Sequence, residues 1–367
     1  FSFGKGKAYY IPLAHCYLGV PDQLNSKMVF DRLKPIFEDP AIKKCGQNIK
    51  YDLIVLANEG ISLKGIDFDT MIASYLLNPS SRGHGLDDLA MNHLGHKNIT
   101  YKELVGTGAK EIRFDEVDIE RATEYAAEDS DITWRLTDKL RPLLTGETLK
   151  LFNEIELPLL EVLAEMEMNG VYIDRKHLEG LSRSIEEELR LHETQIYALS
   201  GETFNINSPK QLAVILFEKM GLPVIKKTKT GYSTDVSVLE QLAEKHELPG
   251  KILTYRQLAK LKSTYVDALP EEIFKESGRV HTSFNQTVTA TGRLSSSNPN
   301  LQNIPIRSEM GKEIRKAFAA EGKGVLLSAD YSQVELRILA HLSEDKALKH
   351  AFKKGEDIHT RTAAEIF

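Results

Sequence analysis

Two acidic residues five positions apart, Asp330 and Glu335, lie where a buried strand is predicted to lead into a helix. Residues 325–329 form a short apolar run with the length and flanks of a buried strand. Ser332 and Glu335 then match a capping box, which predicts the start of a helix. A carboxylate fixed between a strand and a helix is well placed to bind a divalent metal. On spacing alone, a turn at Asp330 and a simple cap at Glu335 fit equally well.

A second set of polar residues lies in the first third of the chain. Tyr125 and Asp129 are four residues apart, so they share one face of a predicted helix. This arrangement lets a tyrosine orient a water molecule beside an acid that holds a metal. Asp52 lies four residues after Asn48 on another predicted helix and can bind a second metal directly or through water. By themselves, Asn-x-x-x-Asp and Tyr-x-x-x-Asp are weak patterns.

A third set suggests contact with a nucleic-acid duplex. Arg293 lies in a hydroxyl-rich stretch, Thr289-Ala-Thr-Gly-Arg-Leu-Ser-Ser296, and Gln302 and Asn303 follow it. A lone arginine is usually a solvated charge, but these neighbours predict a polar surface that faces base-pair edges. Minor-groove acceptors are similar in every base pair, so such contacts test pair shape without reading sequence.

A basic cluster precedes this set and consists of Arg256, Lys260 and Lys262. Its spacing fits contact with phosphates, which position a protein on DNA without specifying sequence. A solvated helix face explains the cluster equally well.

The elements that position these residues follow from hydrophobic periodicity and capping signals. Residues 1–146 read as α/β, the middle as helical, and the stretch from Arg279 as strand with a period of two. The clearest predicted elements are a strand at 9–13 and helices at 48–58, 69–77, 118–140 and 149–168, with a further helix capped by Asp174.

Composition is that of a globular protein, with 367 residues, 41% hydrophobic and 27% charged. This length predicts two or three domains. Two cysteines do not make a disulfide framework, and no apolar run reaches transmembrane length, so we expect a reducing cytoplasm and no membrane partner. The net charge is −11 over residues 1–204, +6 over 205–318 and −1 over the rest. A basic middle suits a segment that follows phosphates, although ordinary variation in surface charge also accounts for it.

Asp330-Tyr-Ser-Gln-Val-Glu-Leu-Arg337 resembles the first catalytic motif of the family A DNA polymerases. The motifs around Arg293 and Gln302, together with Asp357-Ile-His359, continue the resemblance in the same order. It implies template-directed nucleotidyl transfer in DNA replication and repair, on primer–template DNA with deoxynucleoside triphosphates, by a monomer at the bacterial nucleoid. The implied roles are metal binding by Asp330 and the Tyr331 carbonyl, ribonucleotide rejection by Glu335, triphosphate contact by His359 and minor-groove contact by Arg293, assisted by Gln302 and Asn303.

Gly46-Gln-Asn-Ile-Lys-Tyr-Asp52 and Tyr125-Ala-Ala-Glu-Asp129 resemble two of the three motifs of DnaQ-like 3′–5′ exonucleases. This resemblance implies proofreading, with metals at Asp52 and Asp129, catalysis assisted by Tyr125, and DNA contact by Asn48 and Tyr51. Both resemblances imply two-metal sites that use Mg²⁺, with Mn²⁺ as a substitute.

The resemblance predicts a multidomain protein of α/β plus α+β class. A ribonuclease H-like (DnaQ-like) exonuclease domain precedes a helical thumb and part of the palm and fingers. The expected boundaries are 1–146 for the exonuclease domain, 147–174 for the helix and strand that lead into the palm, 175–278 for the thumb, 279–344 for the palm and 345–367 for the start of the fingers.

The exonuclease family's Asp-x-Glu strand would precede Phe1, and the polymerase family's fingers helix and His-Asp-Glu motif would follow Phe367. From the resemblance we therefore expect a fragment truncated at both ends, with an exonuclease sheet that lacks its first strand and without catalysis of its own. Two alternatives stay open: a stand-alone nuclease of the RNase D type, and a non-catalytic DNA-binding module built from the helical middle.

Overall fold

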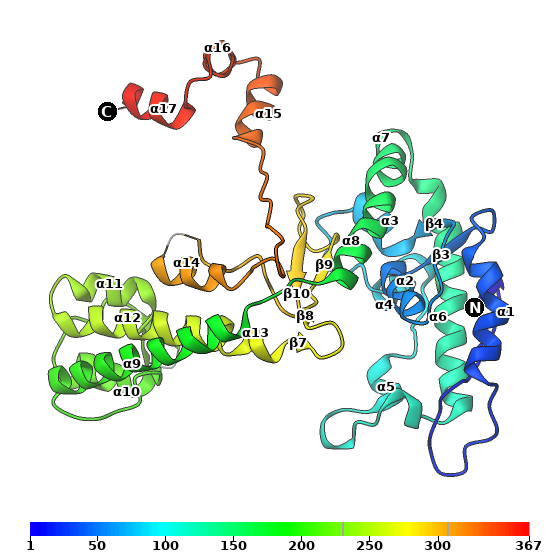
Figure 1. The fold of residues 1–367 in the computed structure, drawn as a ribbon, viewed down its shortest axis with the longest axis horizontal. Helices are drawn as coiled ribbons and strands as arrows, with labels where there is room; N and C mark the ends of the chain where they lie inside the picture. Colours follow the sequence, from blue (N-terminus) through cyan, green and yellow to red (C-terminus); the bar gives the residue numbers. More distant parts are fainter. Residues whose placement is uncertain (230, 307, 367) are drawn as a thin grey trace. The chain divides into compact units, whose positions relative to one another are not determined.

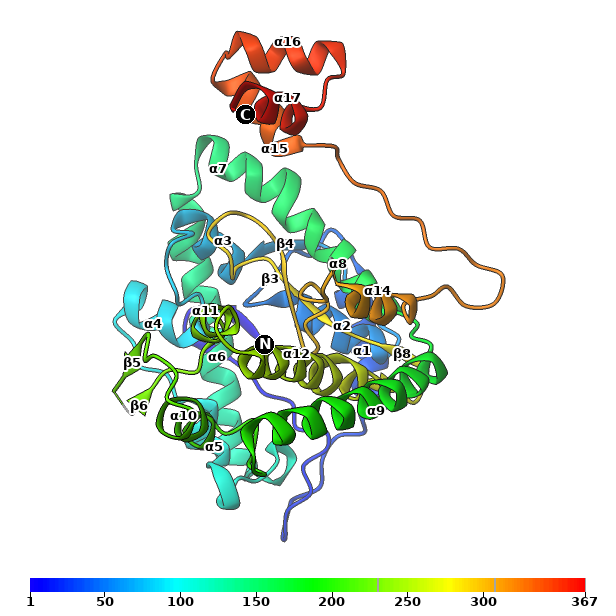
Figure 2. The same cartoon turned by 90° about the vertical axis from the view of Figure 1, so that its left-hand side faces the viewer.

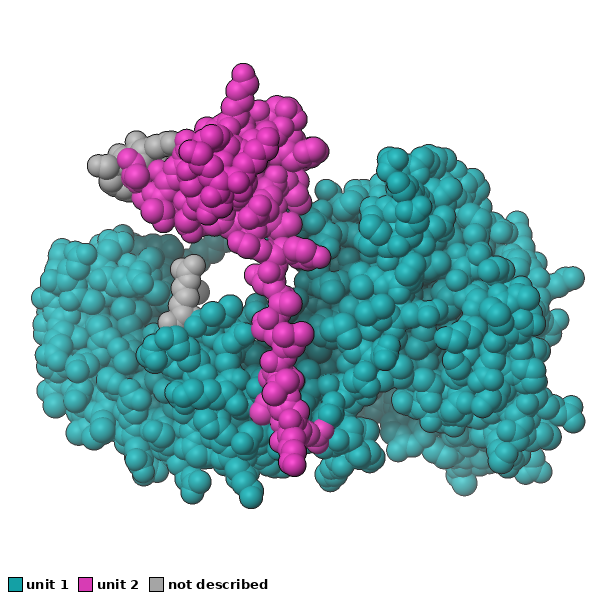
Figure 3. Space-filling model, turned by 45° about the horizontal axis from the view of Figure 1, so that its top comes forward, with its two compact units in different colours: residues 1–318 teal, residues 319–367 magenta. Residues whose placement is uncertain are grey.

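The computed structural model describes residues 1–229, 231–306 and 308–366. The chain divides into two compact units, Phe1–Phe318 and Ala319–Phe367, which Figure 3 colours separately. Among the described residues, helices predominate and the strands pair only in twos. The prediction of a mixed α and β fold with several parts is confirmed.

The first part of unit 1 is an α/β arrangement in which strands β3 and β4 pair in parallel and α2 connects them. Side chains from α2, α3, α4 and α6 form one buried core with Phe68 and Phe152. The elements are β1 (Ser2–Gly4), β2 (Lys7–Ala8), α1 (Ser26–Glu38), β3 (Lys44–Gly46), α2 (Ile49–Asn58), β4 (Ile66–Asp69), α3 (Thr70–Leu77), α4 (Leu86–Leu94), α5 (Tyr101–Val105) and α6 (Ile119–Leu140).

Aspartate side chains start two of the predicted helices of this part. Asp118 accepts hydrogen bonds from the N–H groups of Glu120 and Arg121 at 2.9 and 3.4 Å and begins α6. Asp69 begins α3 in the same way, accepting from Met71 and Ile72 at 2.8 and 3.0 Å. These bonds satisfy donors that have no partner inside the helix, which is why the predicted starts are confirmed.

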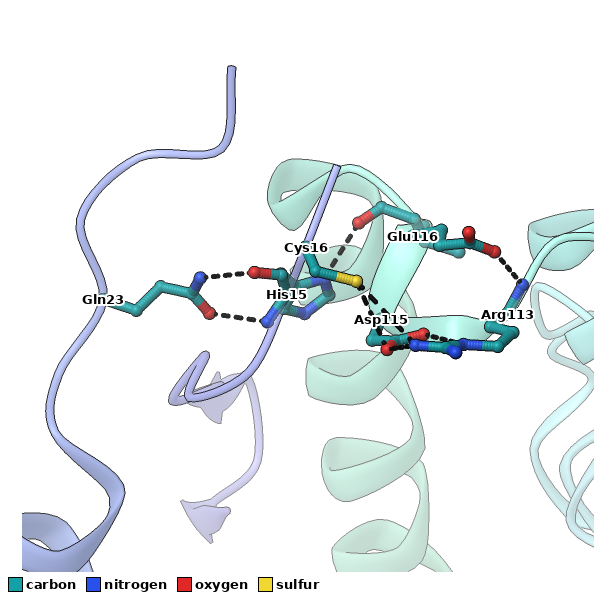
Figure 4. Close-up of polar contacts among 7 residues, drawn as sticks. His15, Cys16, Gln23, Arg113, Asp115 and Glu116 are labelled. Carbon is teal, nitrogen blue, oxygen red and sulfur yellow. Dashed lines mark hydrogen bonds and ion pairs between the residues drawn. The ribbon is translucent and has the colours of Figure 1, made fainter. Parts of the chain in front are cut away.

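The N-terminal loop is fastened to the segment before α6 by the polar network in Figure 4. His15 and Gln23 exchange two hydrogen bonds of 2.8 and 2.9 Å, and the N–H of Cys16 donates to the carbonyl of Asp115 at 2.7 Å. The strand predicted at residues 9–13 is wrong, because the β1–β2 hairpin ends at Ala8 and only Tyr9 of this stretch continues the pairing, through two backbone hydrogen bonds of 2.7 Å with Phe1.

The helical middle is built on two long helices that lie side by side, α9 and α12 (Figures 1 and 2). Asp174 caps α9 as predicted and accepts from the N–H of His177 at 3.0 Å. Three short π-helical segments, 152–156, 214–219 and 262–266, interrupt the helices. The remaining elements are α7 (Gly146–Leu151), α8 (Leu157–Asn169), α9 (Arg175–Ser200), α10 (Pro209–Ala213), β5 (Lys227–Thr228), β6 (Gly231–Tyr232), α11 (Val236–Ala243), α12 (Glu247–Leu261) and α13 (Ala268–Glu271).

The last part of unit 1 contains two antiparallel pairs and one helix. Their bounds are β7 (Ile273–Phe274), β8 (Arg279–Val280), β9 (Ser283–Asn285), β10 (Ser295–Ser297) and α14 (Glu309–Lys316). In the β9–β10 hairpin, Asn285 pairs with Ser295 and Ser283 with Ser297, and β9 packs beside α8 (Figure 1). The strand pattern predicted from Arg279 is therefore only partly confirmed, since the strands break at residues 281–282 and end before Gln286.

The described residues of unit 2, 319–366, contain three short helices, α15 (Val334–Leu342), α16 (Lys346–Lys354) and α17 (Ile358–Ile366). The strand predicted at 325–329 is wrong: these residues have no strand pairing, and Val325 and Leu327 are 87% and 91% exposed. An apolar run becomes a strand only when a neighbour accepts its backbone hydrogen bonds, and within the described residues this run has no such neighbour.

The capping box predicted at Ser332 is also wrong. The N-cap of α15 is Gln333, which has a left-handed backbone (φ 53°) and makes no side-chain cap bond. The carbonyl of Ser332 instead accepts from Nε of Arg337 at 2.9 Å. Glu335 lies in the first turn of α15, where a negative charge favours the helix dipole.

Candidate active sites

Asp52 projects from the first turn of α2, which is held by a fully buried acid on the neighbouring strand. Asp69 accepts a hydrogen bond from the N–H of Ile49 at 2.7 Å, at the start of α2. Asn48, the N-cap residue, adopts a left-handed backbone (φ 56°) and makes no side-chain cap bond. Asp52 is solvent-accessible yet closely surrounded by protein, and this partial loss of water, with the negative charge of Asp69, raises the pKa of its carboxyl to about 6.

Tyr125 and Asp129 meet on one face of α6, as their spacing predicts. The tyrosine hydroxyl lies near enough to the Asp129 carboxyl for each group to shift the pKa of the other. Asp129 is half-buried, and burial raises its pKa to about 6, with further upward effects from the charges of Asp87 and Glu128. Burial and the charge of Asp129 also raise the pKa of Tyr125, so the phenol keeps its proton at neutral pH. The pair is therefore a carboxyl group with a phenol hydroxyl beside it.

The pKa values of Asp52 and Asp129 are raised by different neighbouring charges. Asp69 acts on Asp52, and Asp87 and Glu128 act on Asp129. Within the described ranges, no three His, Cys, Asp or Glu side chains gather closely enough to hold a metal ion. The donors fit a hard divalent cation in kind, since carboxylate oxygens are its preferred ligands, and each raised pKa marks a place where a cation would favour the ionised form. Tyr51, on the same turn as Asp52, is 68% exposed.

Arg293 lies on an exposed turn of the β9–β10 hairpin that is held by a buried tyrosine. The hydroxyl of Tyr75, on α3, donates to the carbonyl of Thr289 at 2.8 Å and accepts from the N–H of Gly292 at 3.1 Å. The hydroxyl of Thr289 donates to the carbonyl of Arg293 at 2.5 Å. Gly292 has φ 77°, a left-handed conformation that favours glycine.

Gln302 is bonded to the residue that follows Arg293, and Asn303 is its neighbour in the chain. The side-chain amide of Gln302 donates to the carbonyl of Leu294 at 3.2 Å, next to Arg293 in the chain. The hydroxyl of Tyr265 donates to the carbonyl of Asn303 at 2.7 Å. All three predicted duplex-contacting residues are exposed.

The predicted phosphate-binding cluster does not present three free cations. Arg256 is half-buried and donates to the carbonyls of Thr234 and Ile206 at 2.9 and 3.2 Å, and burial lowers its pKa. Lys262 lies in a π-helical segment and pairs with Asp267 at 2.7 Å. Of the three, only Lys260 is exposed. Arg256 and Lys262 therefore hold the helical middle together.

The four candidates in unit 2 are exposed to solvent. Asp330 and Tyr331 lie in the extended segment before α15, Glu335 in the first turn of α15 and His359 near the start of α17. Arg337 stacks over the ring of Phe352 at 4.5 Å and joins α15 to α16. Within the unit, α15 therefore has a fixed neighbour, whereas Asp330 lies outside any helix or strand.

Sequence reasoning missed three residues that organise these sites: Asp69, Tyr75 and the buried partner of Lys50, Glu167. Asp69 was visible only as the start of a predicted helix, and Tyr75 as an apolar position. Lys50 forms a buried ion pair with Glu167, and both contact the backbone of Phe284, whose N–H donates to Glu167 at 2.7 Å and whose carbonyl accepts from Lys50 at 2.6 Å. The residues in these contacts are more than 100 positions apart, so no local sequence pattern predicts them.

A cavity of about 520 Å³ is lined by residues of α2, of α8 and of the segment after α2, and by none of the candidate catalytic residues. In the parts of the chain that the structure describes, no helix combines the length and apolar character needed to span a membrane.

Comparison with known proteins finds a family match for each of two parts of the chain. Residues 175–367 match DNA polymerase family A, and residues 4–145 match a family described as 3′–5′ exonuclease. DNA polymerase I of Pseudomonas aeruginosa is 50% identical over 100% of this chain and 41% of its own length. DNA polymerase I of Rhizobium leguminosarum is 48% identical over 99% of this chain and 37% of its own.

A solved structure agrees with these matches. The POL domain of Pol1 from M. smegmatis, in complex with DNA primer-template and dNTP, superposes with a TM-score of 0.77 at 38% identity, covering 92% of this chain and 56% of that one. The chain spans about two fifths of the length of the curated relatives it matches. The match to the family model covers residues 175–367, more than half of the chain, and the chain belongs to DNA polymerase family A.

Proposed function

We propose that the protein performs template-directed DNA synthesis by nucleotidyl transfer in bacterial DNA replication and repair, and that its first part removes mispaired 3′ ends. The observation that carries the proposal is the exposed turn with Arg293, to which Gln302 is joined through Leu294, within the segment that matches DNA polymerase family A. Exposed polar side chains on a fixed hairpin suit contact with the minor groove of a primer–template duplex.

Family A polymerase and 3′–5′ exonuclease domains depend on divalent metals. We propose Mg²⁺, with Mn²⁺ as a substitute, bound at Asp330 and the Tyr331 carbonyl for synthesis and at Asp52 and Asp129 for exonuclease cleavage. When bound, such ions stabilise the attacking and leaving oxygens of phosphoryl transfer.

The remaining residues bind and orient. Tyr125 directs its hydroxyl toward Asp129 and positions the attacking water, while Asn48 and Tyr51 contact the 3′ end of the strand. Glu335 occupies the place of a ribose 2′-hydroxyl, His359 contacts the triphosphate and Lys260 a backbone phosphate. The substrates are primer–template DNA and deoxynucleoside triphosphates, handled by a monomer at the nucleoid in the bacterial cytoplasm. The domain boundaries and the inactivity expected of residues 1–367 alone stay predictions.

Duplex binding tests the proposal on the chain itself. A fluorescent primer–template duplex should bind residues 1–367 with an affinity that falls steeply as salt rises. Arg293→Ala should weaken binding about 10-fold, whereas Arg32→Ala, an equal change of charge on exposed α1, should change it less than about twofold. Equal affinities for all three proteins would refute the role of the hairpin.

Synthesis is tested in the natural full-length protein. Asp330→Asn should lower primer extension with Mg²⁺ by at least about 100-fold while duplex affinity stays within about twofold. Unchanged extension by this variant would remove Asp330 from the catalytic site.

A non-catalytic DNA-binding module is the second candidate. It would show the same salt-dependent binding without extension in the full-length protein. A stand-alone nuclease is not favoured, because residues 175–367 match the polymerase family and not a nuclease.

A further inference from the structure

The turn that carries Arg293 is closed by a side chain from a distant part of the chain. In an ordinary β-turn the carbonyl of the first residue accepts directly from the N–H of the fourth. Thr289 and Gly292 occupy these two positions, and the hydroxyl of Tyr75 lies between them, donating to the carbonyl at 2.8 Å and accepting from the N–H at 3.1 Å. The tyrosine hydroxyl therefore replaces the turn's own hydrogen bond.

Tyr75 is a rigid support. It is 3% exposed and lies on α3, whose start is fixed by the buried carboxyl of Asp69. Its ring meets the ring of His84 edge-on at 5.8 Å, and His84 is in turn hydrogen-bonded to Ser74 at 2.8 Å. A hydroxyl held this firmly fixes the atoms that bind to it.

The base of the same hairpin is fixed to the same part of the molecule. Lys50 on α2 and Glu167 on α8 both bind the backbone of Phe284 in β9, and Gln286 donates to the carbonyl of Glu156 at 3.0 Å. With the base held, the remaining freedom of the hairpin lies in its tip. Tyr75 acts at that tip, one residue before Arg293.

We propose that Tyr75 is a positioning residue for Arg293. Tyr75 lies in the part of the chain that matches the exonuclease family, and by positioning Arg293 it affects how tightly the polymerase part binds a primer–template duplex. This inference rests on the proposed role of Arg293. Without the hydroxyl, the turn either contracts onto its own hydrogen bond or admits water, and in both cases the backbone at Arg293 moves. Thr289, which donates to the Arg293 carbonyl, transmits that movement.

The test uses residues 1–367 and the fluorescent primer–template duplex. Tyr75→Phe, which removes one oxygen atom, should weaken duplex binding about 3- to 10-fold, the loss expected when one ordered hydrogen-bonding group is removed. Thr289→Val should act in the same direction from within the turn. Tyr197→Phe is the matched control, because its hydroxyl also bonds to a backbone carbonyl, that of Phe204, but far from the hairpin; its affinity should equal that of wild type.

Two readouts separate positioning from general destabilisation. In the double variant Tyr75→Phe/Arg293→Ala, binding should be no weaker than in Arg293→Ala alone, because Tyr75 acts through Arg293. Amide hydrogen exchange in residues 289–294 should rise in Tyr75→Phe and stay unchanged in Tyr197→Phe.

Each contrary result has a definite meaning. If Arg293→Ala weakens binding but Tyr75→Phe does not, or if the two effects simply add, the positioning role is refuted and the proposed function stands. If Arg293→Ala has no effect, the proposed role of the turn and this inference both fail, and faster exchange in Tyr75→Phe would leave Tyr75 as a structural support only.

Discussion

The carboxyl of Asp69 accepts a hydrogen bond from the N–H of Ile49 at 2.7 Å, while its other oxygen caps α3. One buried side chain thus holds the start of α2, which carries Asp52, and the start of α3, which carries Tyr75. Burial raises the pKa of Asp69, and the surrounding N–H donors oppose that change. The candidate exonuclease site and the hairpin with Arg293 share this support.

Asp69→Asn should destabilise the protein by about 2–3 kcal/mol, because an amide presents N–H groups where the carboxylate accepted hydrogen bonds. Urea unfolding measures the loss. Asp67→Asn, on the same strand and paired with Arg141 nearer the surface, should cost less than about 1 kcal/mol. Equal losses for the two variants would contradict the special role of Asp69.

Asp52→Asn should stabilise the metal-free protein at pH 7. The pKa of Asp52 is raised to about 6 in the folded state, against about 3.9 in an unfolded chain, so the unfolded state loses this proton more easily and stability falls as pH rises from about 4 through 6. After discounting for the solvent access of the side chain, the gain at pH 7 is about 1 kcal/mol. This gain in stability should vanish near pH 4. Asp22→Asn, on the exposed N-terminal loop, is the control and should show no such gain. Thermal unfolding at pH 7 and pH 4 measures both variants.

His84 should make stability fall in mild acid. Burial lowers its pKa, with the charge of Asp88 opposing, so the folded state keeps His84 neutral where the unfolded chain binds a proton. Its contribution is complete above the unfolded pKa of about 6.5 and is lost as pH falls from there through the lower folded value. His84→Asn should flatten the dependence of the melting temperature on pH between 7 and 5, and His341→Asn on exposed α15 should leave it unchanged. A slope that survives in His84→Asn would assign the effect to another group.

Lys50→Met should cost about 3 kcal/mol, because it leaves the Glu167 carboxylate buried without its cation. The side chains of Lys50 and Glu167 are 11% and 10% exposed, whereas those of the i,i+4 pair Lys27–Asp31 are 82% and 62% exposed. Lys27→Met should therefore change the free energy of unfolding by less than about 0.5 kcal/mol. Denaturant titration compares the two, and a small loss in Lys50→Met would mean that Glu167 takes up a proton instead.

Tyr125→Phe should reduce 3′–5′ cleavage of single-stranded DNA by about 10-fold through kcat, with KM unchanged, and Asp129→Asn by at least about 100-fold. The reason is that, in the proposed function, the phenol orients the attacking water and the carboxylate binds a metal ion. Gel analysis of labelled DNA with Mg²⁺ in the full-length protein measures both. Tyr101→Phe, whose ring lies 6.3 Å from that of Tyr125, is the control and should retain full activity; equal losses in both tyrosine variants would argue against a specific role.

Features set by neighbours in sequence were predictable. The starts of α6 and α9 follow from Asp118 and Asp174, each bonded to N–H groups two or three residues on. The Tyr125–Asp129 pair follows from helix geometry alone. In each case the partner lies within one helical turn, so pattern and structure agree.

Features set by distant partners were not predictable. The apolar run at 325–329 reads as a strand, yet a strand needs a partner that periodicity does not supply. Arg256 reads as a free cation, but two carbonyls from elsewhere in the fold hold it. In the sequence, Tyr75 looks like any core residue, because the turn that binds its hydroxyl lies more than 200 residues away.

The π-helical segment at Lys262–Val266 has an evolutionary consequence. A π turn holds one residue more than an α turn, and a single added residue rotates everything that follows by about 100°. This extra residue lets Lys262 reach Asp267. A one-residue deletion within this segment would restore a continuous α-helix and leave the lysine and the aspartate facing each other four positions apart, but it would rotate α13 and everything after it by about 100°, so we expect insertions and deletions here to be rare.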